Sequence, residues 1–116
     1  VEGKIVVYNN KFDQKMAEVG YGLEAYGIAG AYRRIGAIEA AKLGAVASIA
    51  RSIGSSQNRL PHTGGMGYAE GVKKIPGAAV AYEDGELLAY LAKMGKVRMK
   101  LTLTPKTFPD RLCFFP

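Results

Sequence analysis

Residues 31–52 constrain the fold more than any other stretch of the chain. Their apolar residues recur at helical spacing and define the face that we expect to be buried, namely Ala31, Ile35, Ile38 and Ala41. Gly44 follows this helix, where a C-terminal cap requires a left-handed backbone conformation. Glycine adopts that conformation at the lowest energetic cost. The uncharged run 45–50 then predicts a strand covered on both faces, ended by Arg51 and Ser52.

Three further strands are predicted around this helix and strand. The segments 3–9 and 78–82 are short, apolar runs. The segment 96–104 alternates strictly between apolar and polar residues, which predicts a strand with one face in the core and the other in solvent. Strands that alternate with helices predict an α/β domain with a mixed sheet.

A second helix is predicted after the acidic pair Glu83 and Asp84, with Asp84 as its N-cap and Gly95 as its C-terminal cap. Its buried face is expected to comprise Leu87, Leu88, Leu91 and Met94. The segment 11–30 could begin a helix near Met16, but its repeated glycines favour a flexible connection. The segment 52–74 is polar and glycine-rich, and a connection of this length is usually either a functional loop or a mobile one.

Composition sets limits on the function. A chain of 116 residues is expected to form one domain. The net charge of +6 is spread over separate segments, so nucleic-acid binding is not predicted. No apolar run approaches the roughly 18 residues of a membrane span, so none is predicted. Cys113 is the only cysteine, so no internal disulfide can form, and Pro116 is a poor last residue for a prenylation signal.

The residues suggest no catalytic, cofactor-binding or metal-binding set. His62 is the only histidine and has no second histidine to share a metal ion. The glycine clusters at 20–22 and 64–67 lack the spacing of a phosphate-binding loop, so they are interpreted as turns. This profile favours a binding or lid module over an enzyme. We expect contacts to be made by the long loop, with His62, Thr63, Gly64 and Arg51 as the candidate residues.

Several separated motifs occur in the order found in a known family. They are residues 3–9, 36–37, 39–42, 44–45, 47–48, 51–52, 61–64, 71–72, 74–76, 83–84 and 109–110. These motifs resemble the protease-associated domain of the carboxypeptidase Q-like (plasma glutamate carboxypeptidase) family of two-zinc exopeptidases. The resemblance covers most of residues 1–110. The chain departs from it in a longer segment between Asn9 and Gly36 and in an aperiodic tail, residues 111–116.

The resemblance implies a protease-associated domain over residues 1–110, a compact α/β unit described as a sandwich or open barrel flanked by helices. The start at Val1 leaves open that a first strand is missing. The implied role is a non-catalytic accessory domain that covers the active-site cleft of a secreted or lysosomal exopeptidase. The two zinc ions would belong to the peptidase domain, which with a peptide or protein substrate is the expected partner. A free-standing interaction module without a peptidase, and a homodimer, stay open as alternatives.

Overall fold

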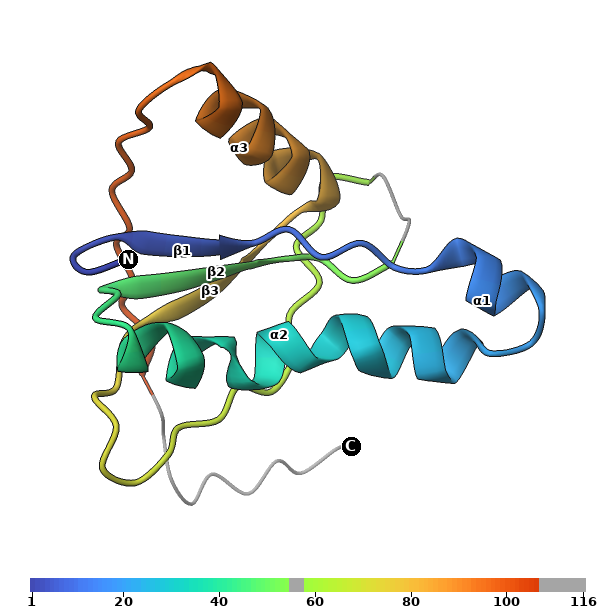
Figure 1. Cartoon of the computed structure of the whole chain (residues 1–116), viewed down its shortest axis with the longest axis horizontal. Helices are drawn as coiled ribbons and strands as arrows, with labels where there is room; N and C mark the ends of the chain where they lie inside the picture. Colours follow the sequence, from blue (N-terminus) through green and yellow to red (C-terminus); the bar gives the residue numbers. More distant parts are fainter. Residues whose placement is uncertain (55–57, 107–116) are drawn as a thin grey trace, which may run out of the picture.

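A computed structural model describes residues 1–54 and 58–106. Its elements are β1 (Ile5–Tyr8), α1 (Gln14–Glu18), α2 (Gly22–Lys42), β2 (Ala47–Arg51), β3 (Gly77–Val80) and α3 (Tyr82–Met94). The strands form one open sheet in the order β1-β2-β3, and where a mixed sheet was expected both strand pairs are parallel. The helices α2 and α3 lie on opposite faces of this sheet (Figure 1). The predicted α/β class is confirmed.

The central strand β2 is the buried strand that the uncharged run predicts. All five of its residues are buried, from Ala47 to Arg51. Ala50 pairs with Tyr8 of β1 on one side and with Ala79 of β3 on the other. Because a neighbouring strand lies on each side and a helix on each face, only small or apolar side chains fit along most of β2.

The helix α2 begins at Gly22, so the prediction of a flexible connection over 11–30 is wrong for its second half. Its glycines serve packing. A side chain at Gly36 would collide with the ring of Tyr8, and one at Gly30 would come within 3.3 Å of Ile53 Cδ1. Tyr8 also donates a hydrogen bond from its hydroxyl to the Gly36 carbonyl oxygen over 2.9 Å. Close approach of the helix to the sheet therefore outweighs the low helix propensity of glycine.

The buried face of α2 differs from the predicted one. Ile35 is 50% exposed, while Ala31, Ile38 and Ala41 are at best half-buried. The residues that face the sheet are instead the small ones: Ala25, Ala29, Gly30, Gly36, Ala37 and Ala40. Larger side chains would hold the helix away from the strands, so they lie at the margin.

The predicted end of α2 is confirmed. Gly44 has a φ of +79°, in the left-handed region. Its N–H donates to the Ala41 carbonyl oxygen, and the Ala45 N–H donates to that of Ala40, which together form a Schellman-type cap. Ala37, Ala40, Ala45 and Ile75 form the core cluster at this end, so the long connection between β2 and β3 also contributes to the core.

The helix α3 begins at Tyr82 with Ala81 as its N-cap, so Asp84 is not the cap. Glu83 and Asp84 lie in the first turn, where their charges still favour the helix dipole. The predicted buried stripe is wrong at three of its four positions, and Leu88 is half-buried. Leu87 is 52% exposed and Met94 is 70% exposed, and Leu91 is also exposed. The helix ends as predicted, with Gly95 as its C-cap.

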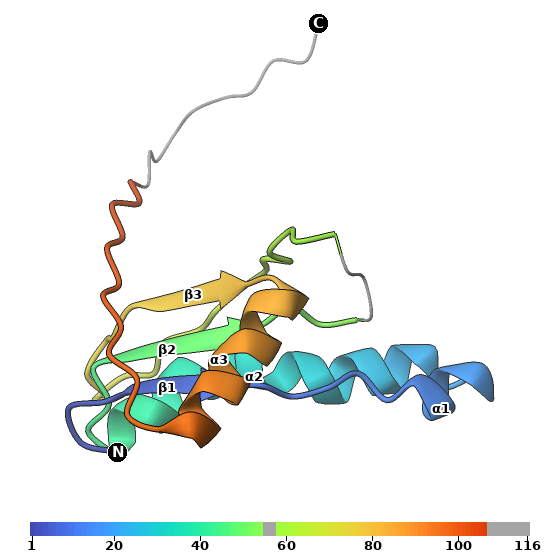
Figure 2. The same ribbon diagram turned by 90° about the horizontal axis from the view of Figure 1, so that it is seen from above.

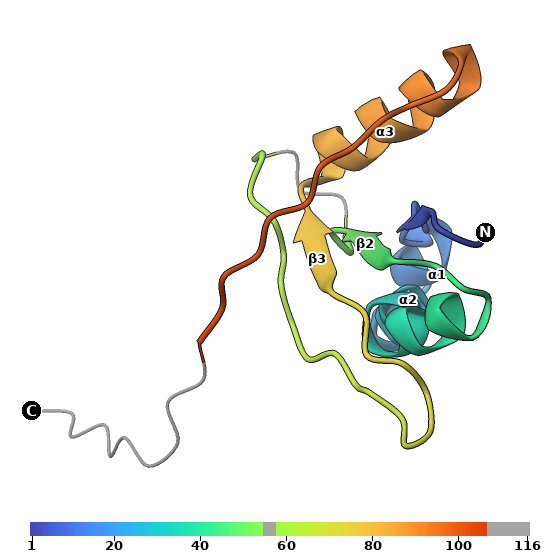
Figure 3. The same ribbon diagram turned by 90° about the vertical axis from the view of Figure 1, so that its left-hand side faces the viewer.

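The segment 96–104 is not a strand, which corrects the clearest strand prediction. It leaves the end of α3 and runs as extended chain past the sheet (Figures 2 and 3). Its alternation fits a strand, but a strand also needs a neighbour to which its backbone is hydrogen-bonded, and no described residue makes such bonds with it. Cys113 and the tail 111–116 lie outside the described residues. Within the described residues, no helix is both long and apolar enough to cross a membrane.

Candidate functional site

The carboxyl ends of the three parallel strands meet at one edge of the sheet, which is the right-hand end of the arrows in Figure 1. Segments that follow strands gather at such an edge, and ligands of open α/β sheets bind there. Here Asn9 and Asn10 follow β1, Ser52 follows β2, and Tyr82 opens α3 directly after β3. Of these residues, Ser52 bonds to the predicted contact loop, and Asn10 and Tyr82 contact Arg51.

Arg51 ends β2 with its side chain fully buried (0% exposed) on the side of α3. Its Nη2 donates to the Asn10 carbonyl oxygen over 2.6 Å, and its guanidinium lies 4.6 Å from the centre of the Tyr82 ring. Gly85 packs against its aliphatic stem, where a side chain would not fit. Arg51 is therefore an internal tie between β1, β2 and α3, and it lies within a strand rather than on the loop.

Glu86 of α3 provides the countercharge for this edge. Its Oε1 is 3.7 Å from Arg51 Nη1 and accepts from Asn9 Nδ2 over 3.4 Å. Its Oε2 accepts from Lys11 Nζ over 3.3 Å. Partial burial alone would raise the pKa of the Glu86 carboxyl, but hydrogen bonds from Lys11 and Asn9 and the charges of Lys11 and Arg51 hold that pKa below its usual value.

His62 is fixed through its backbone. Its N–H donates to Ser52 Oγ over 2.6 Å, and that hydroxyl donates in turn to the Val80 carbonyl oxygen over 2.7 Å. The imidazole Nδ1 lies 3.3 Å from the Ile53 carbonyl oxygen, and the ring centre lies 6.2 Å from that of Tyr26 on α2. The loop is thus tied to β2 and β3 while the His62 residue itself stays exposed.

Thr63 and Gly64 continue the loop across α2. Arg33 Nη1 donates to the Thr63 carbonyl oxygen over 3.4 Å, and its guanidinium lies 6.0 Å from the centre of the Tyr26 ring. A side chain at Gly64 would collide with that guanidinium. A cavity of about 670 Å³ adjoins the loop, and its lining includes Thr63, Gly64 and Arg33. The loop backbone is therefore held on α2 beside an open hollow.

The structure brings three of the four predicted contact residues together. His62, Thr63 and Gly64 lie on one exposed stretch beside α2, whereas Arg51 faces α3 on the other side of the sheet. Sequence reasoning did not find the anchoring residues Ser52, Arg33, Tyr26, Glu86, Asn9 and Lys11. One signal was present: an arginine at the end of an uncharged strand calls for a carboxylate from another element.

The described residues contain no group of three or more histidine, cysteine, aspartate or glutamate side chains placed to hold a metal ion. Within the part of the chain that the structure describes, no hydrogen bond or ion pair joins the His62 ring or the Ser52 hydroxyl to a carboxylate. What the arrangement offers is a rigidly held, exposed loop segment that can contact another molecule through the imidazole, the Thr63 hydroxyl and free backbone groups.

The chain is similar to part of several curated proteins named carboxypeptidase Q. The protein from Bos taurus is 41% identical over 110 residues, which are 94% of this chain and 21% of the relative. The protein from Homo sapiens is 41% identical over 109 residues, covering 93% of this chain and 21% of the relative. The chain thus spans about a fifth of the length of the curated relatives that it matches. No family model matches the chain.

A solved structure is similar as well. The crystal structure of a peptidase M28 precursor from Shewanella amazonensis superposes with a TM-score of 0.57 at 35% sequence identity. The match covers 78% of this chain and 18% of that chain. The likeness in fold and sequence therefore again involves one domain-sized part of a much longer polypeptide.

Proposed function

We propose that this chain is a non-catalytic accessory domain of a carboxypeptidase Q-like zinc exopeptidase, with residues 1–110 forming a protease-associated domain. The observation that carries the proposal is the extent of the similarity. About 41% identity covers nearly the whole of this chain but only 21% of the relatives. In this proposal the two zinc ions and the catalytic residues belong to a separate peptidase domain, and the parent protein is secreted or lysosomal.

The loop at His62 and Thr63 supplies the proposed contact with a peptide substrate or with the peptidase domain. Its backbone is tied to Ser52 at one point and to Arg33 at the next, so little conformational entropy is lost when it binds. The exposed His62 ring and the hollow beside Gly64 offer a polar group next to a recess. Such a loop influences which substrates reach a neighbouring active site without taking part in the chemistry.

A domain exchange tests the accessory role. Residues 1–110 of this chain replace the matched segment of the bovine relative, and dipeptide hydrolysis and zinc content are measured for the chimera and for this chain alone. We expect the chimera to hydrolyse dipeptides with zinc bound, and this chain alone to do neither. Zinc-dependent hydrolysis by this chain alone, with stoichiometric zinc, would contradict the proposal.

The contact role is tested in the same chimera by His62→Ala. Alanine keeps the backbone N–H bond to Ser52, which holds the loop there, and removes the imidazole together with its contact to the Ile53 carbonyl oxygen. We expect KM to rise by roughly three- to tenfold with kcat nearly unchanged, which is the signature of lost substrate binding. Lys15→Ala, an exposed position on α1, is the control and should change neither constant. Equal constants for all three proteins would remove His62 from the contact surface.

A further inference from the structure

We propose that the cavity beside the contact loop binds a small carboxylate with an uncharged aliphatic body. The cavity has a volume of about 670 Å³, and its lining comes from α2, β2, β3, the loop at Thr63 and Gly64, and the extended segment at 102–105. Such a carboxylate is found at the C-terminal residue of a peptide and in short free acids. The inference names a ligand class for the loop, so its biological meaning rests on the proposed function, but binding to this chain is measured without catalysis.

Arg33 of α2 supplies the positive charge of the cavity wall. A guanidinium has five N–H donors, yet the hydrogen bond of the Arg33 side chain to the described residues is a single long one, 3.4 Å to the Thr63 carbonyl oxygen. Its Nε is buried without a partner, and the ion pairs formed within residues 1–54 and 58–106 do not include Arg33. Bonds from arginine to a carboxylate are among the strongest in proteins. The guanidinium therefore keeps unused donors and an unpaired charge, within the described chain, at the wall of a cavity.

The floor of the cavity fits an aliphatic body. Most of the lining is small or apolar, and these residues are Ala50, Met66, Gly77, Ala78, Ala79 and Leu103. Ala50 of β2 and Ala79 of β3 are partners in the register of the sheet, and neither has a side chain large enough to fill the hollow beside it. Sites for small molecules are typically hollows of about 300–1,000 Å³ with apolar walls and a few polar groups that fix the ligand. This cavity has that composition, with Arg33 as its charged group.

The polar lining decides which carboxylates fit. Thr63, Thr102 and Thr104 contribute to the lining, and threonine hydroxyls can bond the amide of an acylated amino acid. The described lining residues include neither aspartate nor glutamate, so a free α-ammonium group would enter without a counter-charge. N-acylated amino acids, which resemble the C-terminal residue of a peptide, should therefore bind better than free amino acids.

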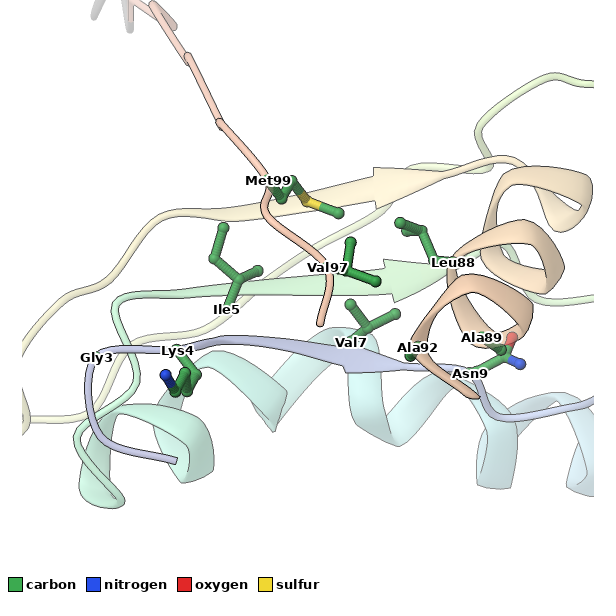
Figure 4. A pocket seen from close by; sticks show the side chains of 10 residues that line it. All are labelled: Gly3, Lys4, Ile5, Val7, Asn9, Leu88, Ala89, Ala92, Val97 and Met99. Carbon is green, nitrogen blue, oxygen red and sulfur yellow. The ribbon is translucent and has the colours of Figure 1, made fainter. Parts of the chain in front are cut away.

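A second cavity lacks this combination and serves as a reference. It has a volume of about 450 Å³ and lies between β1, α3 and residues 97–99, where the side chains of Ile5, Val7 and Leu88 converge (Figure 4). Its described lining contains no arginine and no hydroxyl side chain, and its cation, Lys4, is exposed. A ligand held by apolar contact alone would enter this cavity as well. Amides of β1 and α3 therefore report on such binding in the same sample.

The test titrates the full 116-residue chain, isotope-labelled for NMR, with four compounds: N-acetyl-leucine, its uncharged amide, free leucine and isocaproate. We expect N-acetyl-leucine to bind with a roughly millimolar Kd and to shift the amides of Thr63, Gly64 and Ala79. The uncharged amide and free leucine should bind at least about tenfold more weakly. Isocaproate has the charge and the aliphatic body without the amide. If it binds as tightly as N-acetyl-leucine, the ligands are free acids, and if it binds more weakly, they are peptide C-termini; both results support the site.

Substitutions localise the carboxylate. Arg33→Gln should weaken binding of N-acetyl-leucine roughly tenfold and leave the weak binding of its amide unchanged. The matched control is Arg34→Gln, an exposed neighbour with the same change in net charge, which should alter neither affinity. Because Arg33 also holds Thr63, a second variant leaves that residue in place. Ala79→Leu fills the floor of the cavity and should weaken N-acetyl-leucine and its amide alike, with circular dichroism to show that the variant is folded.

Three results would overturn the inference. They are equal affinity for N-acetyl-leucine and its amide, equal weakening by Arg33→Gln and Arg34→Gln, and shifts confined to the amides of β1 and α3. Hydrolysis by the chimera tests the proposed function separately. An active chimera combined with no carboxylate binding by this chain would refute the ligand site and leave the accessory role intact. Binding to this chain combined with an inactive chimera would refute the accessory role and leave the ligand site intact.

Discussion

Gly36→Ala is expected to destabilise the domain although it replaces glycine by the best helix former. In an exposed helix this change stabilises by about 0.5–1 kcal/mol. At Gly36 the new methyl carbon would lie 2.6 Å from Tyr8 Cε2 and 3.0 Å from Tyr8 Cδ2. The ring cannot move away freely, because its hydroxyl bonds the Gly36 carbonyl oxygen and its centre lies 5.7 Å from that of Tyr32. Overpacking of this kind costs about 1–3 kcal/mol.

The two effects leave a net loss of about 1–2 kcal/mol in the free energy of unfolding. For a domain of this size that lowers Tm by about 4–8 °C, measured by thermal denaturation followed by circular dichroism. The control is Gly27→Ala on the same helix, where nothing lies within 4 Å of the added methyl carbon, so the propensity gain should appear alone as a higher Tm. If Gly36→Ala raises Tm as much as Gly27→Ala does, the packing argument for the glycines of α2 is refuted.

Two further predictions concern the carboxyl edge of the sheet. Because the pKa of Glu86 is lowered in the folded state, its carboxylate stabilises the fold above the pKa of the unfolded chain, and this contribution is lost as the pH falls through the folded pKa. Glu86→Gln should therefore lower Tm at pH 7, and only slightly, because the side chain is 36% exposed to solvent. Near pH 3 the Tm of the variant should match that of the unaltered chain. An equal deficit in Tm at both pH values would contradict this. Ser52→Ala removes the acceptor of the His62 N–H and the donor to Val80, which should cost about 1–3 kcal/mol and speed hydrogen exchange at the His62 amide. Unchanged exchange there would show that Ser52 does not hold the loop.

The strands β1 and β2 and the end of α2 are predictable from sequence because their signals are local. An uncharged run bounded by Gly44 and Arg51 indicates a buried strand wherever the rest of the chain lies. The first half of α2 is not predictable in this way. Gly22, Gly27 and Gly30 count against a helix by propensity, and only the nearness of Ile53 shows why Gly30 is needed.

Residues 96–104 and the exposed face of α3 were wrongly predicted for a different reason. Alternation over 96–104 and the leucines of 84–94 indicate faces that can be buried, but burial also requires a partner that the described residues do not supply. For the site, the motif at His62, Thr63 and Gly64 could be recognised as a loop. Its attachment to Ser52 and Arg33 could not, because neither bond follows a local pattern.

The alanine-rich core cluster has a consequence for how stability varies with temperature. Among the described residues, its fully buried members are Ala37, Ala40 and Ala45, which each bury little apolar surface, and Ile75, while Val6 and Met66 pack against it only partly buried. Unfolding therefore hydrates less apolar surface than usual, and the heat-capacity increment should fall below the common value of about 12–15 cal/mol/K per residue. A small increment makes the curve of free energy against temperature broad and flat. The domain would then keep nearly constant stability on cooling, with a low maximum.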